Sequence, residues 1–423
     1  MEFEFKLKDK FTSDSLITVI AIVITGLCGL LINYIIQKYF NSDGLGVFSY
    51  IISIFLIVNS ISTLGMNRAM VFFTSFYSDN IEKRNQLIIN AFFLVTCWSF
   101  LLFLILNFGL YFLDSFFTKD QQVYLKIVTL AVPFYSINNV GIAVLNGVRR
   151  MKFYSFIRSF RWISLVALLI YISISNPLKY TFYSFLISES LVFLIIFYSF
   201  LRSKYLNGTV RLYSIFLILD YIKYVYPSQI IVSFNENIDI IILENFISEG
   251  SLGVYSFSSK VAKALILVGV AIQTNFNPIV SSYYKNNFID KLKNFCLKLR
   301  NASFRVFSPM ILLTILLYFI LVNSFIAENI YLDNFYNFIL QAIFAGLYAS
   351  FVWSGGILIM TGKIKQNVMR GLVKLIAITL LTYFCVIIFP IKYGIYIGFS
   401  LMMISQLFID RFFIYKYVGI KIF

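Results

Sequence analysis

Charged side chains interrupt several segments of this chain that are otherwise apolar enough to enter a lipid bilayer. Glu236 and Asp239 lie in one such segment, and Lys260 and Lys263 lie in the next. Each pair is spaced i, i+3, which places both members on one face of a helix. Charges inside a membrane are costly and usually face a cavity or a partner. The lysines are therefore candidates for binding an anion, and the carboxylates for binding a coupling ion or balancing the lysines.

The two segments are consecutive, so we expect an antiparallel pair of helices with the charges facing each other. At a rise of 1.5 Å per residue, Asp239 and Lys260 lie roughly 8 to 10 Å below the outer surface, and Glu236 and Lys263 roughly 12 to 15 Å. This spacing predicts two ion pairs, one at each depth. The simpler alternative is that the shallow pair reaches the interface and the deep pair is a structural salt bridge.

Three further charged residues lie within or at the end of apolar segments. Arg161 is a candidate anion contact and Glu189 a candidate ion-coupling or charge-balancing residue, but their segments are neighbours and could simply pair them. Arg68 lies at the inner end of a segment, where it could contact an anionic substrate or extend to the headgroups. Trp353 precedes a Gly-Gly pair and could serve either packing or sugar stacking.

The segments that must position these residues dominate the chain. Of its 423 residues, 60% are hydrophobic and only 13% are charged, which indicates a polytopic membrane protein. A spanning helix needs about 20 apolar residues, and roughly twelve continuous runs meet that length. The sequence therefore predicts an all-α membrane protein. The predicted spans are 16–36, 45–66, 88–113, 126–145, 157–175, 182–201, 223–243, 254–276, 304–325, 335–359, 372–389 and 393–415.

The net charge of +16 follows membrane topology and does not indicate nucleic-acid binding. Most basic residues lie at the termini or in even-numbered loops, whereas the odd-numbered loops hold few bases and most of the loop acids. Cytoplasmic loops carry the excess of Lys and Arg, so both termini are predicted to be cytoplasmic. Three of the four cysteines fall inside predicted spans, so no disulfide framework is expected.

Two stretches repeat at an offset of 207 residues. GLGVFSY occupies residues 44–50 and SLGVYSF occupies 251–257, each at the start of the second span of a set of six. We therefore predict an N-terminal six-helix lobe at 1–201, a cytoplasmic linker with an amphipathic helix at 202–222, and a C-terminal six-helix lobe at 223–423. The first-half counterparts of the four charged residues above are uncharged, which favours a ligand or ion role over packing.

Several kinds of chemistry lack their usual residues. The chain contains no histidine and no complete phosphate-binding Gly-x4-Gly-Lys-Ser/Thr loop. The loops between predicted spans are also short, and the longest outer one has about a dozen residues. We expect no enzymatic activity, no metal site and no cofactor.

A family resemblance follows from these features. The twelve predicted spans in two halves, DGLGVFSY at 43–50, EGSLGVYSF at 249–257, and Asp239 and Lys260 on either side of the second stretch resemble the polysaccharide-transporter branch of the multidrug/oligosaccharidyl-lipid/polysaccharide exporters, and in particular O-antigen flippases of the Wzx type. The resemblance implies two lobes around a central cavity and alternating access. It also implies transport of undecaprenyl-diphosphate-linked oligosaccharide, the O-antigen repeat unit of lipopolysaccharide biosynthesis, across the bacterial inner membrane.

In that interpretation, Lys260, Lys263, Arg68 and Arg161 contact the pyrophosphate or acidic sugars, and Glu236, Asp239 and Glu189 bind a coupling ion or hold the bases. The expected partners are the lipid-linked oligosaccharide, the bilayer and other polysaccharide-assembly membrane proteins. A cation-coupled multidrug exporter is the main alternative, although such an exporter would be expected to concentrate an acidic site in the first lobe, and the first span has no acid. A membrane glycan polymerase is less favoured because such an enzyme is expected to have a large periplasmic loop.

Overall fold

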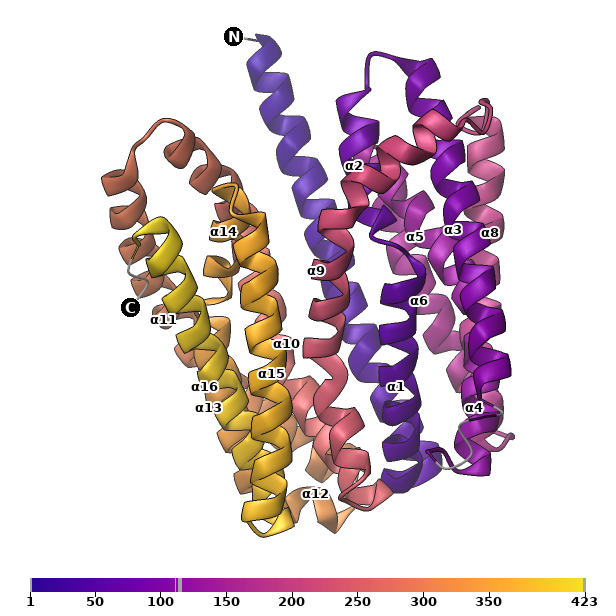
Figure 1. Cartoon of the computed structure of the whole chain (residues 1–423). Coiled ribbons are helices and arrows are strands. Elements are labelled where there is room, and N and C mark those ends of the chain that lie inside the picture. Colours follow the sequence, from indigo (N-terminus) through magenta and orange to yellow (C-terminus); the bar gives the residue numbers. More distant parts are fainter. Residues whose placement is uncertain (1, 111, 113–115, 327, 421–423) are drawn as a thin grey trace. The chain divides into compact units, whose positions relative to one another are not determined.

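A computed structural model describes residues 2–110, 112, 116–326 and 328–420, and the regular elements in these ranges are all helical. The helices are numbered in chain order as in Figure 1. They are α1 (Glu2–Ser62), α2 (Met66–Phe76), α3 (Ile81–Gly109), α4 (Lys119–Thr129), α5 (Val132–Gly147), α6 (Met151–Ser173), α7 (Leu178–Thr181), α8 (Tyr183–Arg202), α9 (Leu212–Glu244), α10 (Glu249–Lys285), α11 (Ile289–Leu321), η1 (Val322–Ile326), α12 (Asn329–Asp333), α13 (Phe335–Ala349), η2 (Val352–Gly356), α14 (Ile357–Met360), α15 (Ile364–Ile388) and α16 (Ile391–Val418).

The helices account for the predicted spans. Among the described residues, nine helices are long and apolar enough to cross a membrane, or up to 11 if each of two bent pairs forms one span. The helix α1 also joins two predicted spans at Asn41, whose φ of 59° is not helical. The bent pairs are α9, with 47° between Leu212–Lys223 and Val225–Glu244, and α13 with the helices that follow it, with 45°. The all-α, multi-span architecture is thus confirmed.

The chain divides into two compact units. One comprises Met1–Tyr39 and Ile54–Ile230, and the other comprises Phe40–Ser53 and Ile231–Phe423. The central part of α1 therefore belongs to the C-terminal unit, and α9 contributes to both units. The division lies within helices, close to Asn41 and within the span that follows the predicted linker.

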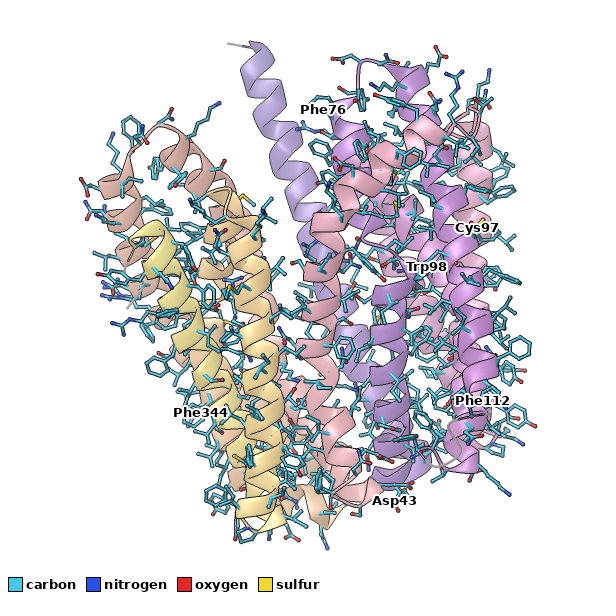
Figure 2. All side chains as sticks on the ribbon, in the orientation of Figure 1. Asp43, Phe76, Cys97, Trp98, Phe112 and Phe344 are labelled. Atoms are coloured by element: carbon cyan, nitrogen blue, oxygen red, sulfur yellow. The ribbon has the colours of Figure 1, made fainter. Side chains whose placement is uncertain are left out.

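The N-terminal unit has its core where α2, α3, α5 and α8 meet. Met66, Ile88 and Val144 are fully buried in this core, and Val192 of α8 packs with them. The outward side is also apolar: Phe76 and Phe112 are 66% and 86% exposed, and Figure 2 shows them on this unit. An apolar exterior around a packed interior is what a lipid solvent requires of a spanning bundle.

The C-terminal unit packs α10 against α11 and α13, and α15 against α16, which run side by side in Figure 1. Trp353 belongs to the core of this unit: its side chain is fully buried, its indole N–H donates to the Ser350 carbonyl at 2.7 Å, and its ring meets Phe276 edge-on. Of the two predicted roles of this residue, packing is therefore the one that its surroundings support.

The repeated LGV[FY]S stretch is a close helix crossing inside the C-terminal unit. A Cβ added at Gly46 would lie 1.9 Å from the Glu249 carbonyl oxygen, and one added at Gly253 would lie 2.0 Å from the Ser42 carbonyl oxygen. Residues 42 and 46 correspond to 249 and 253 at the repeat offset of 207, so the two copies of the stretch contact each other reciprocally. Glycine at both positions lets the two backbones approach, as small residues do at helix crossings in membranes.

Candidate functional site

The most buried carboxylate among the predicted site residues is Asp239, on the second part of α9. It is 1% exposed, and its Oδ2 accepts from the Tyr255 hydroxyl at 2.8 Å and from Lys263 Nζ at 3.0 Å, both on α10. Because α9 and α10 are joined by a short turn capped by Ser248, their charged faces meet as an antiparallel pair. Asp239, Tyr255 and Lys263 are called the acid–lysine cluster below.

The ion pairing in this cluster differs from the prediction, which paired charges that lie at the same depth. Lys263 makes its ion pair with Asp239 and not with Glu236, from which it contacts only the backbone carbonyl, at 3.3 Å. Lys260 donates to the Ser49 hydroxyl at 3.3 Å. The Glu236 side chain is exposed, and it has no ion pair among the described residues. The predicted pairing of Asp239 with Lys260 and of Glu236 with Lys263 is therefore wrong, because a lysine side chain is long enough to reach the next helical turn.

Aromatic rings set the orientation of this cluster. The Tyr255 ring meets those of Tyr396 and Phe399 edge-on, at centroid distances of 6.1 and 6.3 Å. The Lys263 ammonium also lies 5.8 Å from the Phe399 ring, within the range of a cation–π interaction. Since the Lys263 side chain is still 22% exposed, the cluster presents one ammonium at its accessible side and keeps its carboxylate inside.

The first copy of the repeat lacks every charged or hydrogen-bonding member of the acid–lysine cluster. At an offset of 207, Asp239, Tyr255 and Lys263 correspond to Ile32, Phe48 and Leu56. Phe48 retains the ring of Tyr255 but not the hydroxyl that contacts the carboxylate. The repeated sequence pattern therefore does not itself include the acid–lysine cluster, which is present in the second half only.

Arg161 and Glu189 form a separate network in the N-terminal unit. Arg161 Nη2 lies 3.0 Å from Glu189 Oε2, and the two residues are 9% and 5% exposed. Asn138 donates to the same carboxylate oxygen at 2.8 Å, while Arg161 donates to Asn139 at 2.9 Å and lies over the Tyr135 ring. Arg161 on α6 and Glu189 on α8 therefore pair with each other, as the sequence analysis allowed for neighbouring segments.

Arg68 lies apart from that network, in the first turn of α2. The helix begins after Gly65, whose φ of 71° is left-handed, so Arg68 is three residues beyond a sharp break in the chain. The Arg68 side chain is exposed and, within the described part of the chain, forms no salt bridge. It can therefore meet an anion in solution or at a membrane surface.

The structure contains a third charged cluster that the sequence analysis did not predict. Asp410 of α16 lies 2.8 Å from Lys374 and 3.3 Å from Arg370, both on α15, and all three residues are at most 9% exposed. Arg370 also donates to Asn367 and to the carbonyl of Gly355, in the short helix η2. Lys374 and Asp410 each interrupt an apolar run, which is the signal that would have revealed them. The cluster carries one more base than acid, deep in the C-terminal unit.

No group of three His, Cys, Asp or Glu residues able to hold a metal ion occurs in the described ranges. The lysine and arginine side chains of the charged clusters can form ion pairs and attract anions.

The fold is that of a class of multi-span membrane proteins whose solved members include transporters. An inward-facing multidrug resistance MATE family transporter of the MOP superfamily is similar over 94% of this chain and 97% of its own, with a TM-score of 0.76 and 13% identity. The MATE multidrug transporter DinF-BH, solved as a complex, matches 97% and 95% of the two chains, with a TM-score of 0.72 and 15% identity. A MOP superfamily transporter from Pyrococcus furiosus, described as having a binding pocket of reversed polarity, matches 97% and 96%, with a TM-score of 0.72 and 14% identity.

The chain belongs to the family described as polysaccharide biosynthesis protein, whose model matches residues 41–331. No curated protein matches the sequence significantly. The family and the transporter fold together confirm the predicted resemblance to the polysaccharide branch of this superfamily.

Proposed function

We propose that this protein translocates an oligosaccharide linked to undecaprenyl diphosphate from the cytoplasmic to the periplasmic leaflet of a bacterial inner membrane, by alternating access. The observation that carries the proposal is the combination of membership in a polysaccharide biosynthesis family with a transporter fold. A polar glycan cannot cross hydrocarbon by itself, so polysaccharide assembly needs such a carrier when its units are built on one side of a membrane.

The cationic residues supply the attraction for the diphosphate. Lys263 remains partly exposed beside a buried carboxylate, Lys260 lies one turn away on the same helix, and Arg68 is exposed in the N-terminal unit. A phosphate anion in a low-dielectric surrounding gains more from a positive charge than it does in water. Asp239 and Glu236 would balance these lysines or bind the ion that drives transport.

Arg161 as an anion contact and Glu189 as an ion-coupling or charge-balancing residue are weaker parts of the proposal, because the two side chains already form an ion pair with each other. They would contribute if the network opens during the transport cycle. The lobe boundaries at 1–201 and 223–423, the cytoplasmic location of both termini, the O-antigen identity of the glycan and the association with other polysaccharide-assembly proteins also belong to this proposal.

The test is a deletion strain complemented with variants of Lys263. Deletion should cause lipid-linked oligosaccharide to accumulate facing the cytoplasm. Lys263→Arg should restore part of the transport, whereas Lys263→Ala and Lys263→Glu should not, because the site needs a positive field. Lys291→Ala, which removes an exposed lysine on α11, is the matched control and should complement fully.

Two results would contradict the proposal. Full complementation by Lys263→Ala at equal protein abundance would remove the substrate-contact role. A deletion strain with unchanged lipid-linked sugars but new sensitivity to cationic dyes would favour the multidrug alternative, which the fold shared with multidrug transporters also accommodates.

A further inference from the structure

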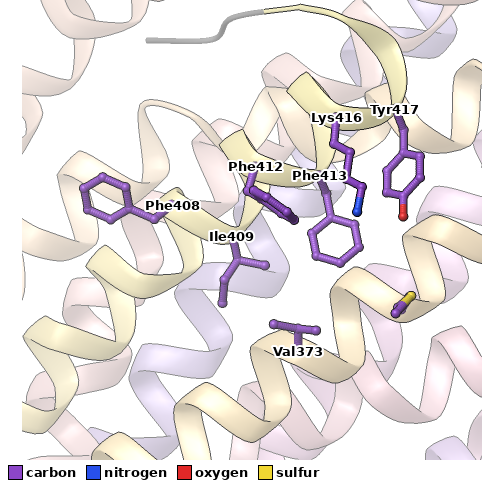
Figure 3. A pocket seen from close by; sticks show the side chains of 8 residues that line it. Val373, Phe408, Ile409, Phe412, Phe413, Lys416 and Tyr417 are labelled. Carbon is purple, nitrogen blue, oxygen red and sulfur yellow. The ribbon is translucent and has the colours of Figure 1, made fainter.

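A groove of about 420 Å³ lies between α15 and α16, close to the C-terminal end of α16. Met369 and Val373 form its side on α15, and Phe408 and Phe412 contribute aromatic rings from α16 (Figure 3). These four side chains are exposed to between 37% and 58%. The groove is thus open and largely apolar, and it lies on the surface of two helices that are long enough to span a membrane.

One charged residue lines the groove. Lys416 lies in the last turn of α16, and Figure 3 shows its side chain extending from α16 toward α15. Its ammonium lies 5.5 Å from the rings of Phe412 and Tyr417, and within the described residues it makes no salt bridge with a carboxylate. The aromatic faces hold the ammonium at the end of the groove without neutralising it.

We propose that this groove binds an anionic glycerophospholipid, with one acyl chain along the apolar walls and the phosphate on Lys416. The location at the end of a spanning helix places the ammonium at headgroup depth while the groove runs into the hydrocarbon region. The volume lies within the usual range for small-molecule sites. A net-negative headgroup is favoured over a zwitterionic one because the charged side chain that lines the groove is positive.

Native mass spectrometry of the purified full-length protein tests this site with defined lipids. Phosphatidylglycerol should be retained more strongly than phosphatidylcholine of the same acyl chains. Lys416→Gln should weaken phosphatidylglycerol binding about five-fold and leave phosphatidylcholine binding unchanged, since one lysine near a membrane surface is worth about that factor. Lys291→Gln is the matched control, because Lys291 also lies over an aromatic ring, at 4.4 Å from that of Phe288, but outside the groove.

A second pair of variants tests the apolar walls. Val373→Trp should fill the groove and reduce retention of both lipids, whereas Leu380→Trp, at an exposed position of α15 outside the groove, should not. Unchanged thermal unfolding of all variants shows that the fold is intact. Equal retention of the two lipids, with no effect of Lys416→Gln, would overturn the proposal. Preferential retention of undecaprenyl phosphate over phosphatidylglycerol would also overturn it, since the occupant would then be a substrate-type lipid.

Discussion

Ser256 donates a hydrogen bond of 2.6 Å to Ser49, and the two serines occupy the same position in the two copies of the repeat, 207 residues apart. The repeat is therefore also a contact: each copy of LGV[FY]S packs on the other copy. Lys260 donates to the same Ser49 hydroxyl. The crossing that the glycines allow thus lies directly beside the charged face of α10.

Replacing Gly46 by Ala should reduce the amount of folded protein. The added Cβ would lie 1.9 Å from the Glu249 carbonyl oxygen, a backbone atom that cannot move without shifting α10. Overpacking of this kind costs about 1 to 3 kcal/mol. Fluorescence-detected size-exclusion chromatography after a heat step would show an earlier loss of the monodisperse peak.

Gly29→Ala is the matched control, because Gly29 lies in the same helix and a Cβ there would meet nothing within 4 Å. That change should be neutral or stabilise by up to about 1 kcal/mol, since alanine favours helix over glycine. Equal behaviour of the two variants would show that the crossing at Gly46 is looser than its geometry indicates.

Removal of Lys263 should destabilise the protein more than removal of Asp239. Lys263→Met leaves a carboxylate that is 1% exposed with only the Tyr255 hydroxyl, whereas Asp239→Asn leaves a lysine that is still partly exposed. Breaking a buried pair costs about 3 to 5 kcal/mol, less where one partner reaches solvent. The double variant should be milder than Lys263→Met alone, with a coupling of about 0.5 to 3 kcal/mol in thermal unfolding.

A second double-mutant cycle, with Lys260→Met in place of Lys263→Met, distinguishes the observed Asp239–Lys263 pair from the predicted Asp239–Lys260 pair. Lys260 donates to Ser49, so its coupling to Asp239 should be the smaller of the two. A larger coupling for Lys260 would show that Asp239 is paired by depth after all.

Asp410→Asn should be among the most destabilising single changes in the C-terminal unit. It would leave Lys374 and Arg370 adjacent, both at most 9% exposed, without their shared carboxylate. The expected cost is about 3 to 5 kcal/mol. Adding Lys374→Met to Asp410→Asn should recover part of the thermal stability, and no recovery would argue that Asp410 mainly serves Arg370.

Membrane topology can be tested by cysteine labelling in a cysteine-free background. Cysteines at Lys83, Lys152 or Lys291 should resist a membrane-impermeant thiol reagent in intact cells, because basic loops remain cytoplasmic. Cysteines at Asp120 or Glu249 should react once the outer membrane is permeable. Labelling in the opposite sense would reverse the predicted orientation.

The sequence by itself determined the architecture and the position of its main charges. Long apolar runs must become helices in lipid, since each backbone polar group needs a partner within its own segment. The i, i+3 spacing likewise put Glu236 and Asp239 on one face of a helix, and the repeat marked the two stretches that the structure brings into contact. These features can be read from the pattern of residue types along the chain.

Only the tertiary structure decided which charges pair. Asp239 pairs with Lys263 and not with Lys260, and the Lys263 ammonium also lies near the Phe399 ring. Spacing along one helix does not show which residue of the neighbouring helix a side chain will reach. Lys374 and Asp410 are visible in the sequence as interruptions of apolar runs, but their meeting depends on the register of α15 against α16. Register is set by side-chain packing along the whole interface between two helices, so no short motif encodes it.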